Sequence, residues 1–491
     1  MKLRLLTILI CYVAQLNGQD TLMLPPIDST QVYGGEKADT LSSMMEDSVL
    51  TYSEYLYWVE NYHPLSLVSG YEVDLAERNV RVSRGGFDPM LYGNFKEKVF
   101  KDTDYYERLN AGIEIPTWMG LSVVGGFEEN SGVFLNPEGT VPDRGLFNAG
   151  IKANLGAGLI MDDRRAALRQ AQIGLDMGIN QRQILLNDLY LEATRAYFNW
   201  AFANQLLQVA EEALDVASVR YQAVIESYKF GDRPAIDTVE AYTQVLNRIY
   251  RLREAQNEWI ESVNLAATYL WGEDLSVINI PPGIVPELET KSLSLITGDI
   301  PLNIPSSHPE LMMVRNKRSF LDIDRRLFSQ KLLPKVEVNY NVLAENISPA
   351  GFDEYFDGAQ FFENNYTFGA KVSFPLFIRE ARGKLGATKI KLDMNQAEFD
   401  NKRALLEAKL NAGLVKLSNI RDQVNIYEQN VEYLDILLEG ERALFNIGES
   451  SLFLVNSRET KLIEGYQIYY SLIAKEKIST AIVRNTAGLG F

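Results

Sequence analysis

Residues 207–240 read LQVAEEALDVASVRYQAVIESYKFGDRPAIDTVE and decide the fold. Apolar side chains recur in this stretch at alternating spacings of three and four residues, which is the pattern of a coiled-coil seam. Gly231 then ends the predicted helix, and Pro234 begins a second helix that carries its own seam back. The stretch therefore predicts a long helical hairpin. The seams consist of Leu207, Ala210, Leu214, Ala217, Tyr221, Val224 and Tyr228, and then Val245, Ile249, Leu252, Trp259, Val263, Ala266 and Leu270.

The same seam and turn return in the second half of the chain. Apolar residues again alternate at three and four positions, and only Glu441 breaks the frame. Gly448 follows this seam as Gly231 follows the first, so each half predicts one long hairpin. The repeat unit is far longer than a solenoid repeat, which indicates an internal duplication. The second seam consists of Val424, Tyr427, Val431, Leu434, Leu438 and Phe445.

The helices that lead into the two turns are predicted to be very long. No proline occurs between Pro142 and Pro234 or after Pro375, so the sequence allows continuous helices over about 161–230 and about 379–447. At ~1.5 Å rise per residue, each helix would be roughly 100 Å long. A helix of that length exceeds any single globular core, so it must project and needs partners along its whole length.

Stretches ahead of these helices change from a helical period to a period of two. Such strands have one apolar and one polar face, which suits either a soluble sandwich or an outer-membrane barrel. The strongest runs reach about ten residues, the length of a tilted membrane strand, and this favours the barrel. The apolar positions are Phe147, Ala149, Ile151, Ala153, Leu155, Ala157 and Leu159; Val336, Val338, Tyr340, Val342 and Ala344; and Tyr366, Phe368, Ala370, Val372, Phe374 and Leu376.

The first residues have the layout of a secretory signal peptide. Lys2 and Arg4 precede an apolar run over residues 5–13, and small residues near Gly18 offer a cleavage site, so we expect a signal peptide over 1–18. The only cysteine, Cys11, lies in this segment. Residues 19–49 are polar and acidic and are predicted to form a flexible leader.

Composition and motifs argue against several classes of function. The formal net charge of −17 argues against nucleic-acid binding, which needs a basic face. The sequence shows no catalytic constellation, so we expect neither an enzyme nor a cofactor. The two histidines, His63 and His308, each precede a proline at equivalent repeat positions. We interpret them as helix N-caps rather than as a metal site.

The repeats define the expected domain organisation. The first repeat is predicted over 50–283, with barrel strands at about 89–159 and a helical hairpin at about 161–272. The second is predicted over 284–491, with a helix at about 309–332, strands at about 335–377 and a hairpin at about 379–487. The predicted fold class is therefore mainly α with membrane β.

The sequence from about 50 to 490 resembles the TolC-like outer-membrane efflux proteins. The resemblance rests on the duplication, the order of helices and strands, the stretch Ser373-Phe374-Pro375-Leu376-Phe377 before the long helix, and the two glycine turns. It implies a homotrimer whose strands share one barrel in the outer membrane of a Gram-negative bacterium, in contact with its lipid. It also implies an exit duct for small molecules or proteins that works with a periplasmic adaptor and an inner-membrane transporter.

The resemblance places the functional residues at the two hairpin turns. Acidic side chains just beyond each turn narrow the tunnel in this family, and Asp237 matches the first such position, with Glu240 one helical turn further on. In the second half, Leu454 stands where the family often has a carboxylate, so the expected constriction combines the two acids with Leu454 and Phe453. The alternative is that Asp237 only caps its helix and Glu240 faces solvent.

The turns are also the expected docking surface for the adaptor, because glycine permits close approach of another backbone. Arg233 and Arg458 are alternatively expected to tie neighbouring hairpins together through the acidic residues. The predicted docking residues are Gly231, Asp232, Arg233, Gly448, Glu449 and Arg458.

The number of barrel strands is the main departure from the family pattern. Residues 89–150 hold more alternating runs than the matching part of the second repeat, so an extra hairpin either enlarges the barrel or forms a loop outside it. We expect the family count of four strands per protomer. Two alternative functions are a periplasmic coiled-coil adaptor or scaffold and a surface structural protein without a pore.

Overall fold

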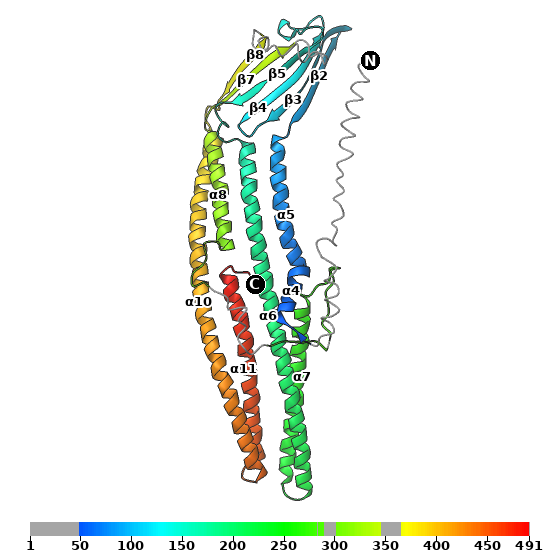
Figure 1. The fold of residues 1–491 in the computed structure, drawn as a ribbon, viewed down its shortest axis with the longest axis vertical. Coiled ribbons are helices and arrows are strands. Elements are labelled where there is room, and N and C mark those ends of the chain that lie inside the picture. Colours follow the sequence, from blue (N-terminus) through cyan, green and yellow to red (C-terminus); the bar gives the residue numbers. More distant parts are fainter. Residues whose placement is uncertain (1–48, 282, 289–300, 345–364, 491) are drawn as a thin grey trace, which may run out of the picture.

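The computed structural model of the chain is elongated, with an antiparallel sheet at one end and long helices that run to the other (Figure 1). It describes residues 49–281, 283–288, 301–344 and 365–490. The predicted signal peptide and nearly all of the predicted leader lie outside the described residues. Among the described residues, none of the helices combines the length and apolar character that a membrane-spanning helix needs.

The elements follow one another in two similar series, each with a helix, strands and a long helical hairpin. The helices are α4 (Tyr52–Tyr62), α5 (Pro64–Arg84), α6 (Asp163–Lys229), α7 (Ala235–Ala267), α8 (Pro309–Gln330), α10 (Arg379–Asn446) and α11 (Leu452–Thr486). The strands are β1 (Val49–Leu50), β2 (Met90–Phe100), β3 (Thr103–Pro116), β4 (Leu121–Ser131), β5 (Leu146–Asn154), β6 (Val285–Pro286), β7 (Lys335–Ala344) and β8 (Tyr366–Ser373). Short 3-10 turns occupy Gly85–Phe87 and Pro137–Gly139. The predicted fold class, mainly helical with an amphipathic sheet, is confirmed.

The two long helices α6 and α10 are continuous over 67 and 68 residues. Near the sheet, α6 packs between α5 and α8; near the turns it packs between α7 and α11. α10 packs against α8 near the sheet and against α11 near the turns. The apolar seams form these contacts, because Val431 and Leu438 of α10 are buried with Val455 and Leu462 of α11. Each long helix therefore exchanges one set of partners for another along its length.

An aromatic core lies where α6 changes partners. Tyr197 of α6 and Tyr55 of α4 are fully buried, with ring centroids 5.1 Å apart. The Tyr197 hydroxyl donates to the Leu50 carbonyl at 2.7 Å, and the Tyr55 hydroxyl donates to the Ala266 carbonyl at 3.0 Å. These bonds satisfy the buried hydroxyls; the first holds β1 against α6, and the second holds α7 against α4.

The two histidines cap equivalent helices, as the sequence predicts. The His63 Nδ1 accepts the Leu65 N–H at 3.1 Å at the start of α5, and the His308 Nδ1 accepts the Glu310 N–H at 3.2 Å at the start of α8. Both caps need a neutral imidazole, because a protonated Nδ1 cannot accept. Burial lowers the pKa of both rings; at His308 the Glu310 carboxylate partly opposes this effect.

These caps should make the fold sensitive to mild acid. A base whose pKa is lowered by folding binds fewer protons when folded, so its contribution is complete above the unfolded pKa of about 6.5 and is lost below it. We expect the thermal midpoint, followed by circular dichroism, to fall between pH 7.5 and 5.5. The double variant His63→Asn/His308→Asn keeps a cap acceptor that does not titrate, so its midpoint should change less. An equal fall in both proteins would contradict the assignment.

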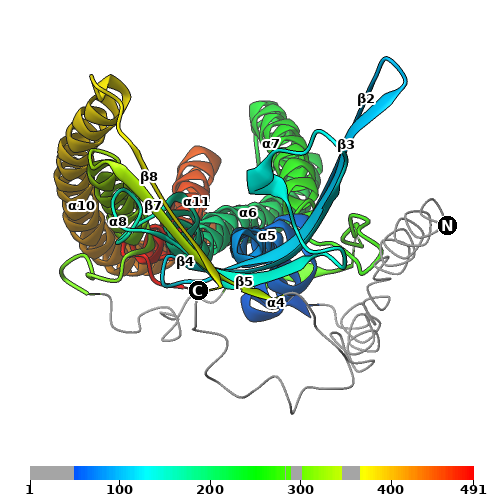
Figure 2. The same cartoon turned by 90° about the horizontal axis from the view of Figure 1, so that it is seen from above.

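In the described part of the chain, the large sheet has six strands in the order β2-β3-β4-β5-β7-β8, and all neighbouring strands are antiparallel. The expectation of four strands is therefore wrong for this chain. The additional residues of the first repeat form the hairpin β2–β3, which continues the sheet beyond β4. Figure 2, which looks at the molecule from its sheet end, shows the resulting sheet as a curved arc.

The register keeps one apolar face across the whole sheet. From β3 to β8, one row of directly paired residues runs Ile113, Gly125, Ala149, Val342 and Tyr366. A neighbouring row on the opposite face runs Glu114, Val124, Gly150, Asn341 and Thr367. Because alternate residues of a strand point to opposite faces, the sheet is apolar on one side and mainly polar on the other.

A candidate gate at the hairpin turns

The two turns have the same backbone geometry. Gly231 and Gly448 have φ of +78° and +83°, a conformation that glycine adopts without strain. After Gly231, the Asp232 N–H donates to the Ser227 carbonyl at 3.0 Å; after Gly448, the Glu449 N–H donates to the Leu444 carbonyl at 2.9 Å. Each of these is the hydrogen bond that closes the six-residue loop of a Schellman motif. A glycine directly after an apolar seam was therefore a correct sequence signal for both turns.

Asp237 lies in the first turn of α7, where the helix dipole favours an acid. Its Oδ2 is 3.4 Å from Nη1 of Arg233, and both side chains are partly buried. The Arg233 guanidinium also lies 4.1 Å from the ring centroid of Phe445 on α10. Arg233 therefore pairs with an acid of its own hairpin and touches the other hairpin through an aromatic ring.

Glu240 also reaches the second hairpin. Its Oε1 accepts a hydrogen bond from Nδ2 of Asn456 on α11 at 3.4 Å. Arg458 of α11 lies 3.5 Å from Glu441, the residue that breaks the α10 seam, so this pair joins the two helices of the second hairpin. Glu441 also bonds with Ser450 in the turn. Of the two predicted tying arginines, only Arg233 contacts the other hairpin within the described chain.

Several apolar side chains at the turns are exposed. Phe453 and Leu454 follow the second turn, and Phe230 stands before Gly231 with 79% of its surface exposed. Behind them, Val224, Ala241 and Leu452 form a small buried cluster from α6, α7 and α11. Apolar packing thus joins the hairpins just above the turns, and the exposed side chains project beyond that contact.

A buried polar cluster between the hairpins centres on Glu459 of α11, which is 5% exposed. Arg220 of α6 donates to both of its carboxylate oxygens, at 2.8 and 3.0 Å. Arg248 of α7 lies 3.9 Å from Glu459 and donates to Thr460 at 3.2 Å, and Arg442 of α10 lies 3.6 Å from Glu459. One carboxylate therefore holds cations from three other helices.

Burial makes this cluster depend on its acid. Arg248 is 5% exposed, and desolvation lowers its pKa, whereas the Glu459 carboxylate acts in the opposite direction. Arg220 also donates to Asn456 at 2.9 Å, which connects the cluster to Glu240. Removing the carboxylate would leave two deeply placed guanidinium groups without their counter-charge, and this is strongly unfavourable in a protein interior.

The sequence held a signal for this cluster that the seam pattern obscured. Glu459 continues the three-and-four spacing of the buried residues Leu452, Val455 and Leu462, so an acid stands on an apolar seam. The prediction that Ile249 of α7 belongs to the seam is wrong, because Ile249 is 41% exposed and the neighbouring Arg248 is buried instead. A charged residue at a seam position was therefore the sequence signal that could have identified the Glu459 cluster.

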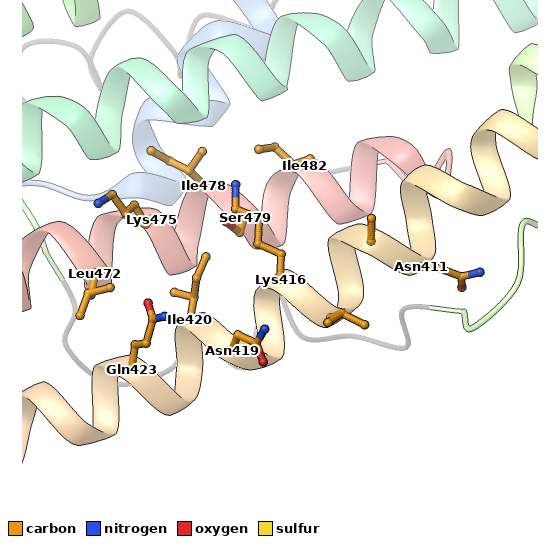
Figure 3. Close-up of a pocket in the computed structure, with 12 residues that line it drawn as sticks. Asn411, Lys416, Asn419, Ile420, Gln423, Leu472, Lys475, Ile478, Ser479 and Ile482 are labelled. Carbon is orange, nitrogen blue, oxygen red and sulfur yellow. The ribbon is translucent and has the colours of Figure 1, made fainter.

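A groove of about 890 Å³ lies between α10 and α11, away from the turns. Figure 3 shows side chains that line it, among them Leu472, Ile478 and Ile482 of α11 and Lys416 and Ile420 of α10. Its lining includes neither acids nor histidines, so the groove offers an apolar surface with ammonium groups rather than acid–base chemistry.

The same arrangement of sheet and helices occurs in solved outer-membrane channels. OprN matches with 13% identity and a TM-score of 0.63, over 89% of this chain and 90% of that chain. VceC from Vibrio cholerae matches with 15% identity and a TM-score of 0.61, over 89% and 96%. CmeC from Campylobacter jejuni matches with 13% identity and a TM-score of 0.59, over 89% and 86%.

No protein-family model and no curated protein matches the sequence. The structural matches show that the chain has the fold of outer-membrane channels. The resemblance to TolC-like proteins that the sequence indicates is confirmed at the level of the fold.

Loss of the Glu459 charge should cost far more stability than loss of an exposed acid, because it leaves buried guanidinium groups without a counter-charge. Glu459→Gln keeps the side-chain shape but removes the charge, and we expect a loss of about 3 kcal/mol of stability, seen as a lower thermal midpoint. Glu464→Gln on the same helix is the matched control. Its pair with Lys461 is more than half exposed, so that loss should stay below about 1 kcal/mol. Equal midpoints for the two variants would show that the cluster is not a principal contact.

Proposed function

We propose that the protein is an outer-membrane exit duct. One observation carries this proposal: a sheet with one apolar and one mainly polar face is continued by helices of about 100 Å. The apolar face suits contact with outer-membrane lipid, and the polar face suits an aqueous lumen. The helices are long enough to carry that lumen far into the periplasm, as the resemblance implies for a Gram-negative cell.

The duct requires more than one copy of the chain, and we propose a homotrimer. One chain forms only part of a wall, with β2, α5 and α7 along one side and β8 and α10 along the other (Figures 1 and 2). Both sides carry large apolar residues that are exposed in a single chain, and such patches are typical of interfaces. They include Ile236, Val239, Tyr242, Leu246 and Tyr250 on α7 and Ile390, Met394, Ile426, Tyr433 and Ile436 on α10.

We propose that the hairpin turns of the three copies form the closed end of the duct. Threefold symmetry would bring Asp237 and Glu240 near their own copies, and like charges in a narrow tunnel favour cations. Phe453 and Leu454 are exposed at the same end and would add an apolar constriction. The Glu459 cluster supports this role, because it holds the first hairpin of a chain against the second.

We propose that the exposed turns bind the partner proteins of the duct. Gly231 and Gly448 allow close backbone approach, and Phe230, Ile236 and Ile447 are each more than 60% exposed. Such a surface suits a periplasmic adaptor that presents a helical hairpin and links the duct to an inner-membrane transporter. Small molecules or proteins would be the cargo, delivered by that transporter. A periplasmic scaffold, the competing hypothesis, would have no use for an apolar sheet face.

Conductance in planar bilayers tests the duct and its gate together. The wild-type protein should insert and show small, cation-selective currents. Glu459→Gln should increase the single-channel conductance several-fold, because the hairpins lose their central contact, whereas Glu464→Gln should leave it unchanged. A protein that never conducts, in wild-type or variant form, would support the scaffold hypothesis.

Changes at the turns should separate docking from conduction. Phe230→Ser with Ile447→Ser removes exposed apolar surface at both turns but leaves the Glu459 cluster intact, so bilayer conductance should persist. Export in cells should fall by an order of magnitude or more, because the adaptor loses its contact. The matched control is Val133→Ser, which changes an exposed apolar residue in the loop after β4, away from the turns. If the double variant left export unchanged, the adaptor surface would lie elsewhere. Charge reversal at Arg233 should then leave export unchanged as well.

A further inference from the structure

The hairpin β2–β3 continues the amphipathic pattern of the sheet. Leu91 pairs with Ile113 and Phe95 pairs with Leu109, all on the apolar face. β3 in turn pairs with β4 over ten consecutive positions, from Glu107 with Ser131 to Pro116 with Ser122.

The opposite face of the hairpin is polar. Asn94 pairs with Asn110, and Lys96 pairs with Arg108. The Asn110 amide donates to Glu128 of β4 at 3.0 Å, so the polar face is also joined by side chains. A loop outside the membrane would need neither this register nor a continuous apolar face. The hairpin β2–β3 therefore has the same amphipathic pattern as the other four strands of the sheet and continues it as part of the same wall.

The two outer strands of the sheet are suited to each other. Within the described chain, β2 pairs only with β3, and β8 pairs only with β7. β2 carries the chain away from α5, and β8 returns it to α10, so β2 and β8 of adjacent copies would lie antiparallel. Both expose large apolar residues, such as Phe95 on β2 and Phe368 on β8. Open edges of this kind pair with another strand wherever one is available.

We propose that β2 of one copy pairs with β8 of the next, so that three copies of the six-stranded sheet close an 18-stranded wall. This inference rests on the proposed trimeric duct and concerns its width. With a strand spacing of about 4.8 Å and a tilt of about 40°, an 18-stranded wall is about 36 Å across its backbone, and a 12-stranded wall is about 24 Å across. An 18-stranded barrel encloses a water-filled channel of porin width. The outer mouth would then admit bulky hydrophilic cargo, and selection would fall to the helical tunnel and its turns.

Cysteine pairs can identify the strand that meets β8. Cys11 is the only cysteine in the sequence, so Cys11→Ala gives a clean background. Asn94→Cys on β2, combined in turn with Thr367→Cys and Lys371→Cys on β8, samples two registers on one face. Val124→Cys on β4, combined with the same two β8 changes, is the matched control. It tests whether the hairpin leaves the wall and exposes β4. Oxidation in outer membranes should give covalent multimers on non-reducing gels for the β2–β8 pairs only.

The outcomes separate this inference from the proposed function. Multimers from the β4–β8 pairs instead would overturn the wide wall and place the hairpin outside it. Multimers from no pair, with a native mass of three chains, would also overturn it but leave the trimeric duct standing. A native mass of one chain would remove the duct and the wall together. As a second measurement, end-on electron micrographs should show a ring nearer to 36 than to 24 Å across its backbone.

Discussion

A helix about 100 Å long can bury its apolar side only if other helices accompany it from end to end. α6 and α10 meet this constraint by changing partners part of the way along, with α5 and α8 near the sheet and α7 and α11 near the turns. The aromatic core around Tyr197 sits where α6 makes this change, and its buried hydroxyl bonds keep the neighbouring segments in place. The length of the two helices thus dictates the arrangement of almost every other helix.

A cluster of buried charges around Glu459 joins the two hairpins near the turns. Apolar seams hold the two helices of each hairpin together, but they do so at many similar positions and specify little about how one hairpin sits on the other. The Glu459 carboxylate differs, because it takes guanidinium groups from both helices of the first hairpin and from α10. A buried charge cluster of this kind fixes one relative position of the hairpins and resists sliding. It stands close to the turns, where the structure holds the two hairpins together.

Much of this architecture could be predicted from the sequence, because seams, turns and alternating strands are local patterns. The hairpins, both glycine turns and the histidine caps all depend on residues close together in the chain. The strand count failed because alternation identifies a strand but not whether it joins the sheet; pairing of β3 with β4 decides that. The Glu459 cluster was missed for a related reason. Its four charged members lie on four helices, and only the packing of the two repeats brings Arg220 and Arg248 to one acid.

The same distinction applies to the predicted constriction. Spacing from Gly231 located Asp237 correctly at the start of α7, but the contacts with Arg233, and those of Glu240 with Asn456, depend on side chains from elsewhere. Those contacts show that Asp237 and Glu240 take part in the packing of the hairpins.

Among the described residues, the first repeat gives four strands to the large sheet and the second gives two, and this inequality has a topological consequence. In the proposed duct, each strand would carry the chain from one side of the membrane to the other, so an even number would return it to the side from which it left. A hairpin is therefore the smallest insertion that leaves α6 on its original side, whereas a single added strand would send the whole helix outward. Growth of such a wall can proceed only in steps of two, and the first repeat of this chain carries one such step.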